Sequence, residues 1–272
     1  MSENGKYIEA GGFKTHFHEA GEGEPILLIH GSGPGVSAWA NWRLVFPELS
    51  KQYKLYAPDV VGFGYTERPE NMEYSVNVWV NHMISFIETL NLENLSIVGN
   101  SMGGALALHI ANRRPDLVKK LILMGSVGIE FPITKELDAV WGYEPSVENM
   151  RALIATFAYD QSAASNDDLV ELRYKASIQE GFQEAFSAMF PAPRQRCVDA
   201  LALSEDQLRK IEIPVLLIHG REDRIIPIEK TSWKLSKILP KAELHVFSEC
   251  GHWTQIEKTQ PFINQVDDFL KR

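Results

Sequence analysis

The stretch Leu95-Ser96-Ile97-Val98-Gly99-Asn100-Ser101-Met102-Gly103-Gly104 decides the fold. Leu95 to Val98 has the composition of a short buried β-strand, and the small-residue-rich segment from Met102 to Asn112 is typical of a helix packed closely on a sheet. A Gly-x-Ser-x-Gly motif between a strand and a helix forms a sharp turn that presents the serine hydroxyl above the sheet edge. The context therefore predicts that Ser101 is a nucleophile. The alternative is a glycine turn that serves packing alone.

On both sides of this stretch, short apolar segments alternate with segments of helical periodicity. Eight strands are predicted, at Tyr7 to Ala10, Phe13 to Ala20, Pro25 to His30, Lys54 to Ala57, Leu95 to Val98, Leu121 to Gly125, Val215 to His219 and Leu244 to Phe247. Helices are predicted from near Ser37, over Ser75 to Leu90 and over Pro261 to Leu270. This alternation predicts an α/β fold with a mostly parallel eight-stranded sheet and helices on both faces.

The region between Gly128 and Ile211 lacks any further strand pattern. It is amphipathic and aromatic, which predicts a helical insertion between two strands of the sheet. Most of its aromatic residues are expected to pack inside the insertion. We therefore expect a core of residues 1–131 and 206–272, with a helical cap of residues 132–205.

A serine nucleophile needs a base that is held in place by a third group. In this chain order, serine is followed by the acid and then by the base. His252, in Gly251-His252-Trp253 after the last predicted strand, is the candidate base. Asp223, on the loop that follows the strand at Val215, is the candidate acid. Its neighbour Glu222 is the alternative, but is typical of a solvated surface charge.

The negative charge that forms on an attacked carbonyl oxygen needs two hydrogen-bond donors already in place. The backbone N–H of Met102 is one candidate, and that of Ser32 or Gly33 is the other. Ser32 and Gly33 belong to the glycine-rich segment Gly31 to Gly35, which could alternatively be a dinucleotide-binding loop. That interpretation is disfavoured because Val36 stands where the third glycine is required.

Charge and composition exclude several classes of protein. The net charge of −9 and the absence of a long basic segment argue against nucleic-acid binding. The N-terminal residues lack the pattern of a secretion signal, and the longest apolar segments are too short to span a bilayer. Two cysteines, Cys197 and Cys250, predict reduced thiols in a cytoplasmic protein. Cys250 is disfavoured as a nucleophile because no second His or Asn constellation points to it.

Several longer motifs resemble the meta-cleavage-product hydrolases, carbon–carbon bond hydrolases of bacterial aromatic degradation that have the α/β-hydrolase fold. The resemblance covers nearly the whole chain and rests on His30 to Gly35 followed by Ser37 to Trp42, Gly99 to Gly104, Gly220 to Asp223, and Gly251 to Glu257. Within the insertion, Leu137 to Tyr143 and Met189 to Arg196 resemble the branch that acts on 2-hydroxymuconate semialdehyde. The triad motifs are shared by many hydrolases, whereas the first loop and the insertion segments are more specific.

The resemblance implies hydrolysis of a 2-hydroxy-6-oxo-dienoate, an anionic small molecule, without a cofactor or a metal. It also implies that relatives form dimers or larger homo-oligomers. Arg173 matches the arginine that holds the substrate carboxylate, and Asn41 and Asn100 match side chains near the oxyanion and the 2-position oxygen. Trp253 matches a pocket wall beside the base, and Phe157 is placed on the acyl side of the pocket.

These residues could also have purely structural roles, because a lone arginine on an amphipathic helix is usually solvated and an asparagine often stabilises a local turn. Two other functions also remain open at this stage. One is a carboxylesterase or lactonase with the same triad, and the other is a non-catalytic ligand-binding protein on a hydrolase scaffold. The motifs do not fix the group at the scissile carbon, which is an aldehyde, a methyl ketone or a larger alkyl ketone.

Overall fold

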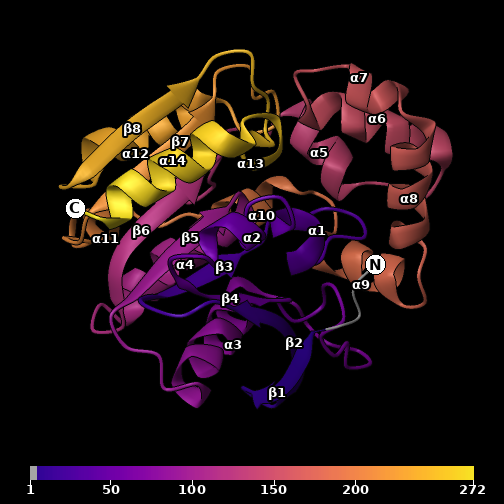
Figure 1. The fold of residues 1–272 in the computed structure, drawn as a ribbon. Coiled ribbons are helices and arrows are strands. Elements are labelled where there is room, and N and C mark those ends of the chain that lie inside the picture. The colour runs from indigo at the N-terminus through magenta and orange to yellow at the C-terminus, as the bar shows by residue number, and fades with distance from the viewer. Residues whose placement is uncertain (1–4) are drawn as a thin grey trace.

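In the computed structural model, which describes residues 5–272, eight strands form one sheet in the order β1-β2-β4-β3-β5-β6-β7-β8 (Figure 1). β1 and β2 form a hairpin, β2 pairs antiparallel with β4, and every later pairing is parallel. The strands are β1 (Lys6–Ala10), β2 (Phe13–Ala20), β3 (Pro25–Ile29), β4 (Lys54–Pro58), β5 (Leu95–Asn100), β6 (Val118–Met124), β7 (Val215–Gly220) and β8 (Ala242–Phe247). The predicted α/β fold with a mostly parallel sheet is confirmed.

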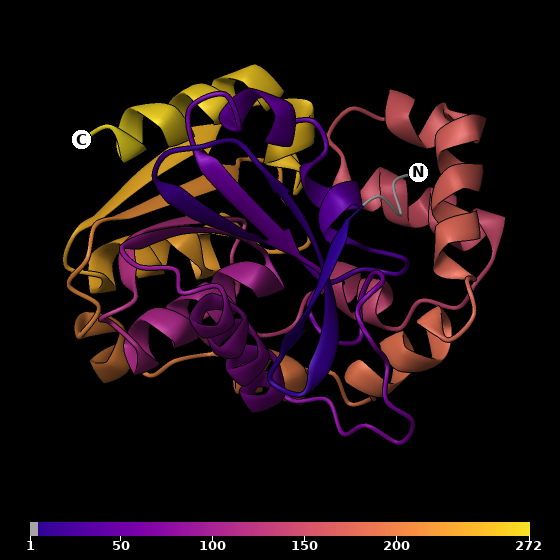
Figure 2. The same ribbon diagram turned by 60° about the horizontal axis from the view of Figure 1, so that its bottom comes forward.

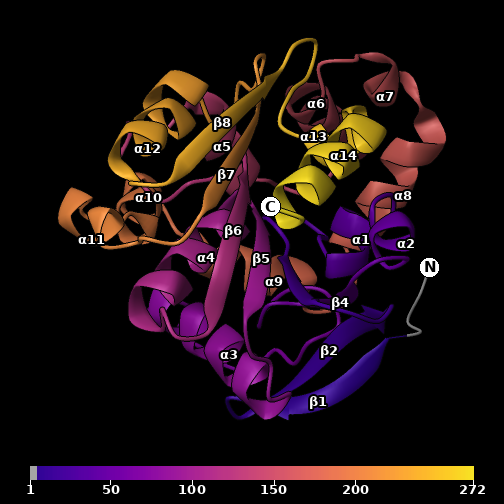
Figure 3. The same cartoon turned by 60° about the vertical axis from the view of Figure 1, so that its left-hand side comes forward.

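Helices cover both faces of this sheet. The helices that flank the sheet are α1 (Ala38–Trp42), α2 (Phe46–Leu49), α3 (Val76–Thr89), α4 (Met102–Arg113), α10 (Gln195–Leu201), α11 (Glu205–Arg209), α12 (Ser232–Ile238), α13 (Thr254–Glu257) and α14 (Thr259–Leu270), with a 3-10 turn η1 (Ile228–Lys230). Figure 3 shows α3, α4 and α12 on one side of the strands and α1, α2 and α14 on the other. No helix among residues 5–272 has the length and apolar composition of a membrane span.

The side chains of the central strands supply both apolar layers. In β3, Leu27 and Ile29 pack into the layer beneath α3 and α4, while Ile26 and Leu28 pack into the layer that contains α1 and α14. Successive side chains of a strand point to opposite faces, so a strand covered on both sides must be apolar throughout. This explains why the buried strands appear as continuous apolar runs in the sequence.

A second group of helices lies between β6 and β7. It consists of α5 (Lys135–Trp141), α6 (Val147–Phe157), α7 (Ser162–Ser165), α8 (Asp167–Ser177) and α9 (Phe182–Met189), and we call these five helices the cap. Figure 2 shows the cap helices gathered at one side of the sheet. No strand interrupts residues 125–214, as predicted.

Local sequence explains how the cap helix α6 forms and what it buries. The Ser146 side chain accepts a hydrogen bond from the Asn149 N–H and so caps the first turn. Its buried residues recur at helical spacing, at Met150, Leu153, Ile154 and Phe157. All four side chains line the cavity described below, so the buried face of α6 forms one wall of the site.

Candidate active site

Ser101 occupies a strained turn between β5 and α4. Its φ of +55° lies in the left-handed region, which residues with a side chain rarely adopt. A Cβ atom on Gly99 would lie 2.5 Å from the carbonyl oxygen of Gly103, and one on Gly103 would lie 2.5 Å from that of His30. The turn therefore requires glycine at both positions, because these neighbours are backbone atoms. It places Ser101 on the wall of a cavity of about 600 Å³.

His252 and Asp223 meet at the same edge of the sheet. Asp223 follows β7, and His252 lies between β8 and α13. The Nδ1 atom of His252 lies 2.7 Å from Oδ2 of Asp223, while Oδ1 of Asp223 accepts hydrogen bonds of 2.9 Å from the N–H groups of Ile225 and Ile226. A carboxylate can only accept, so Nδ1 carries the proton and Nε2 is left with a free lone pair.

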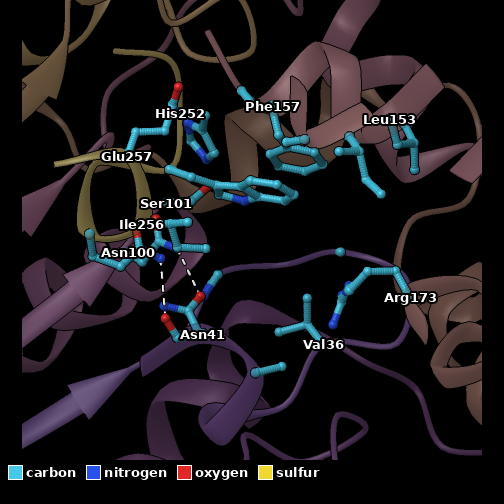
Figure 4. A pocket seen from close by; sticks show the side chains of 18 of the residues that line it. Val36, Asn41, Asn100, Ser101, Leu153, Phe157, Arg173, His252, Ile256 and Glu257 are labelled. Carbon is cyan, nitrogen blue, oxygen red and sulfur yellow. Dashed lines mark hydrogen bonds between the residues drawn. The ribbon is translucent and has the colours of Figure 1, made fainter. Parts of the chain in front are cut away.

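Ser101 and His252 line the same cavity, and Figure 4 shows Ser101 beside the His252 ring. Among residues 5–272, no hydrogen bond joins the Ser101 hydroxyl to this ring. Catalytic hydrogen bonds are often long in a ligand-free site and tighten when substrate binds. The arrangement has the components of nucleophilic catalysis: a strained serine, a buried imidazole with a defined tautomer, and a buried carboxylate.

The Asp223 carboxylate is held in its ionised form. Burial alone would raise its pKa, but electrostatic attraction to the adjacent His252 ring and hydrogen bonds from His219 and His252 outweigh burial and bring the pKa well below its ordinary value. His219 lies at the end of β7, with Nε2 3.3 Å from Oδ2 of Asp223 and 2.7 Å from the carbonyl oxygen of Ile226. Its position at the end of a predicted strand, four residues before Asp223, is the sequence signal for this contact.

The loop after β3 lies opposite Ser101 and supplies candidate oxyanion donors. The backbone N–H groups of Ser32, Gly33 and Met102 make no hydrogen bond within the described part of the chain. His30 holds this loop from beneath, because its Nδ1 lies 2.8 Å from the Gly31 carbonyl oxygen and its Nε2 accepts from the Val60 N–H at 3.0 Å. Ser32 and Gly33 line the cavity and Met102 directly follows Ser101, so the N–H of Met102 with that of Ser32 or Gly33 is a candidate pair of oxyanion donors.

Asn41 and Asn100 form a pair at the base of the cavity, drawn with dashed lines in Figure 4. The Asn100 Nδ2 donates to Oδ1 of Asn41 at 2.8 Å, and the same oxygen accepts from the Gly31 N–H at 3.2 Å. These contacts fix the orientation of both amides. They leave Nδ2 of Asn41 and Oδ1 of Asn100 buried without a partner among the described residues. Buried polar atoms are nearly always paired, so this donor and this acceptor are available to a ligand.

Arg173, on the cap helix α8, reaches across to the same cavity. Its Nη2 donates to the Pro34 carbonyl oxygen at 3.2 Å, and no carboxylate within residues 5–272 forms an ion pair with it. Burial, together with the neighbouring charge of Arg43, lowers the pKa of Arg173 to about 10, so the guanidinium is still charged at neutral pH. Arg43 also lines the cavity and has no ion-pair partner in that part of the structure. Unpaired guanidinium groups in a cavity are suited to bind a carboxylate.

Aromatic and aliphatic side chains form the rest of the cavity wall. The rings of Phe157 and Trp253 stack at 4.8 Å with an interplanar angle of 9°, and the Phe157 ring centroid lies 5.6 Å from that of His252. Phe157, from the cap, and Trp253, from the core, therefore close the cavity over the imidazole. The structure brings Phe157 and Arg173 to one cavity.

Two glutamates and a tryptophan near the site were missed or misjudged in the sequence. Glu222, expected to be a solvated charge, instead accepts from the Cys250 N–H at 3.0 Å. Glu257 accepts from three N–H groups around the His252 loop. It ends the motif Gly251 to Glu257 on which the resemblance partly rests, but the motif alone assigns it no role. Trp141 of the cap donates from Nε1 to the Ser32 hydroxyl at 2.8 Å. Burial raises the pKa of the Cys250 thiol to about 12, which is consistent with its rejection as a nucleophile.

Comparison with known proteins places this site in a family. Residues 24–259 match the model of the alpha/beta hydrolase fold family. The chain is 55% identical to a 2-hydroxy-6-oxo-2,4-heptadienoate hydrolase of Pseudomonas putida, over 99% of this chain and 97% of that one. It is 54% identical to a 2-hydroxymuconate semialdehyde hydrolase of Pseudomonas sp., strain CF600, over 98% of this chain and 94% of that one.

A solved structure agrees with these relatives. A serine-to-alanine mutant of the meta-cleavage product hydrolase from Pseudomonas fluorescens IP01, complexed with acetates, superposes with a TM-score of 0.96. The two chains are 53% identical, and the match covers 98% of this chain and 97% of that one. The chain therefore belongs to the α/β-hydrolase fold family and, within it, to the meta-cleavage-product hydrolases, which are carbon–carbon bond hydrolases.

Proposed function

We propose that this protein hydrolyses 2-hydroxymuconate 6-semialdehyde to formate and 2-hydroxypenta-2,4-dienoate in the degradation of aromatic compounds. One observation carries the proposal: the cavity that holds Ser101 also holds an unpaired arginine, Arg173, and two unpartnered amide atoms, those of Asn41 and Asn100. A serine, a histidine and an aspartate serve acyl transfer in general. A fixed cationic group with a nearby free donor and acceptor favours a substrate that carries a carboxylate and a neighbouring oxygen.

The residues of the site have the following roles in this proposal. Arg173 holds the substrate carboxylate, and Asn41 and Asn100 bind the 2-position oxygen. Phe157 and Trp253 enclose the acyl side of the substrate beside His252. The helical cap domain, for which we propose the boundaries 132–205, contains the five cap helices and also α10. It supplies Arg173 and Phe157, while the core supplies the reacting groups.

The chemistry begins with ketonisation of the dienol, which makes the departing carbon an electron sink. His252 removes the proton from the Ser101 hydroxyl, and the serine oxygen adds to the C6 carbonyl carbon. The N–H of Met102, with that of Ser32 or Gly33, stabilises the oxyanion. The C5–C6 bond then breaks, and its electron pair passes through the conjugated C3–C4 double bond to the 2-oxo oxygen, which takes the proton from His252 to give 2-hydroxypenta-2,4-dienoate. Water, deprotonated by His252, cleaves the formyl ester of Ser101 and releases formate.

The dienolate form of the substrate is yellow, so its disappearance gives a direct test. Incubation with the product of a catechol 2,3-dioxygenase should bleach the colour and release one formate per dienoate consumed. The rate is compared with that on a nitrophenyl ester, to distinguish this activity from a carboxylesterase or lactonase. Ester cleavage without bleaching would overturn the proposal. The methyl ketone analogue, tested in parallel, measures how strictly the site requires an aldehyde.

We also propose that the protein acts in the cytoplasm as a homo-oligomer. The two cysteines, Cys197 and Cys250, form no disulfide and suit a reducing compartment. Light scattering coupled to size-exclusion chromatography tests the assembly, since a monomer mass of 30.7 kDa would contradict it.

A further inference from the structure

The carboxylate of Glu257 lies between the loop that carries His252 and the end of the cap helix α6. Its Oε1 accepts from the Gly251 N–H at 2.8 Å. Its Oε2 accepts from the N–H groups of Tyr159 and Asp160, at 2.7 and 3.1 Å. One side chain therefore receives three backbone donors from two segments that are about ninety residues apart in the sequence. We call residues 250–253 the base loop and residues 157–160 the cap hinge.

A second set of contacts joins the same two segments. The His252 N–H donates to the Phe157 carbonyl oxygen at 2.8 Å, and the rings of Phe157 and Trp253 are stacked. A Cβ atom on Gly251 would lie 2.9 Å from the Tyr159 nitrogen, so glycine allows this close approach. The backbone of the candidate base is thus bound directly to the segment that encloses the substrate.

The chemistry of this junction requires an acceptor that has no donor of its own. The donors that meet at Glu257 are all N–H groups, and a carboxylate offers two oxygens with about four lone-pair positions. Glutamine has the same shape but replaces one oxygen with an NH2 group, which would face an N–H and leave it unpaired. Gly251 is buried, so its N–H is destabilising when unpaired, whereas Tyr159 and Asp160 are exposed. A glutamine that keeps its oxygen toward Gly251 therefore gives up the cap hinge, and one turned the other way leaves the base loop without its acceptor.

We propose that Glu257 is a positioning residue that holds the base loop and the cap hinge as one unit, so that the position of the cap sets the position of His252. The proposal rests on the proposed role of His252 as the base. It extends that role by making the enclosure of the substrate and the alignment of the base a single event. Glu257 acts through His252 and Phe157 and takes no part in the chemistry.

The first experiment compares Glu257→Gln with Glu229→Gln, a control at an exposed glutamate that has no described partner. We expect Glu257→Gln to lower kcat at least tenfold on both the dienoate and a nitrophenyl ester, whereas the control stays within twofold of wild type. The ester needs the base but has no carboxylate for Arg173. A variant that loses dienoate turnover and keeps ester turnover would confine Glu257 to the cap and overturn the proposal. A lower melting temperature with an unchanged kcat would also overturn it, by assigning a role in stability alone.

The second experiment uses the wild-type protein and does not depend on a variant that folds. Native-state hydrogen exchange, resolved to single amides, should show Gly251, Tyr159 and Asp160 exchanging with one common opening free energy. Different opening free energies for the base loop and the cap hinge would overturn the proposal. Neither the exchange nor the ester assay requires the dienoate, so failure of the proposed substrate and failure of the Glu257 coupling give different results.

Discussion

The turn at Ser101 and the loop at His252 lie side by side but are held in place by different means. The serine turn is fixed by neighbours in the sequence, since Gly99 and Gly103 permit a left-handed residue between β5 and α4. The base loop contains no pair of glycines that fixes its backbone in this way and is held by side chains from outside the loop. Glu222 binds the Cys250 N–H, Glu257 binds the Gly251 N–H, and Asp223 binds the imidazole.

This difference shows where precision in the site originates. The turn is rigid because its backbone conformation is sterically determined, and strain of this kind persists only where the surroundings enforce it. The base loop is precise only while its acceptors are present, and part of its support comes from the cap. Substitutions at the turn should therefore lower kcat directly. Substitutions around the base loop should lower kcat by an amount that depends on which hydrogen bond is lost.

The largest expected effect comes from the turn itself. Ser101→Ala should lower kcat on the dienoate by about 10⁴-fold or more, because the covalent step is lost. The alanine variant retains the strained backbone, whereas glycine adopts this conformation without strain. The free energy of unfolding of Ser101→Gly should therefore exceed that of Ser101→Ala by about 1 kcal/mol. Stopped-flow bleaching and urea unfolding measure the two effects. Equal stability of both variants would show that the turn is not strained.

Removal of the carboxylate that binds the His252 imidazole should have the next largest effect. Asp223→Asn should lower kcat by about 10⁴-fold, because the amide no longer enforces the Nδ1-protonated tautomer of His252. A serine-directed phosphonate should label this variant far more slowly than wild type, with little change in the circular dichroism spectrum. Rapid labelling would mean that Ser101 is activated by another group.

A substitution of Arg173 tests carboxylate binding independently of the Ser101 turn and the base loop. Arg173→Met should lower kcat/KM on the dienoate by about 10- to 150-fold, the range for loss of a charge-assisted hydrogen bond of about 1.5–3 kcal/mol. Turnover of a neutral nitrophenyl ester should change less than threefold. Stability should be unchanged or higher, because an unpaired cation is removed from a partly buried position. Equal losses on both substrates would assign Arg173 to cap structure instead of carboxylate binding.

The two regions also differ in how well they are predicted from the sequence. The sheet, its strand positions and the place of the insertion follow from apolar patterns of local residues, and the fold prediction is confirmed. The Ser101 turn is encoded within five residues. His252 and Asp223 were nominated from chain order, but the contacts of His219, Glu222, Glu257 and Trp141 were not foreseen, because each joins segments brought together only by tertiary packing. A lone glutamate in a sequence has no feature that distinguishes a buried acceptor from a surface charge.

The pH dependence of stability provides a smaller test of the base loop. The pKa of Asp223 in the folded protein is lowered, against about 3.9 in an unfolded chain. A lowered carboxyl pKa contributes stability that is fully present above the unfolded value and is lost as the pH falls through the folded value. Wild type should therefore exceed Asp223→Asn in unfolding free energy at pH 6, and the difference should narrow below pH 4. A constant difference between pH 6 and pH 3 would contradict this account.

The smallest expected effect concerns Glu222, which holds the base loop from the side of the acid. Its contact differs from that of Glu257, because Glu222 receives one N–H from the base loop at Cys250, and its side chain is 28% exposed. Glutamine retains one oxygen that can accept this N–H. Its NH2 group replaces the oxygen that pairs with Arg221, whose exposed side chain can turn into solvent. Glu222→Gln should consequently lower kcat less than about threefold, in keeping with a change of about 0.5 kcal/mol in one hydrogen bond. Glu222→Ala should have a larger effect, since the Cys250 N–H then loses its acceptor. If Glu222→Gln instead matched Glu257→Gln in kcat on both substrates, the charge near the base, and not the number of donors each carboxylate receives, would set the position of His252.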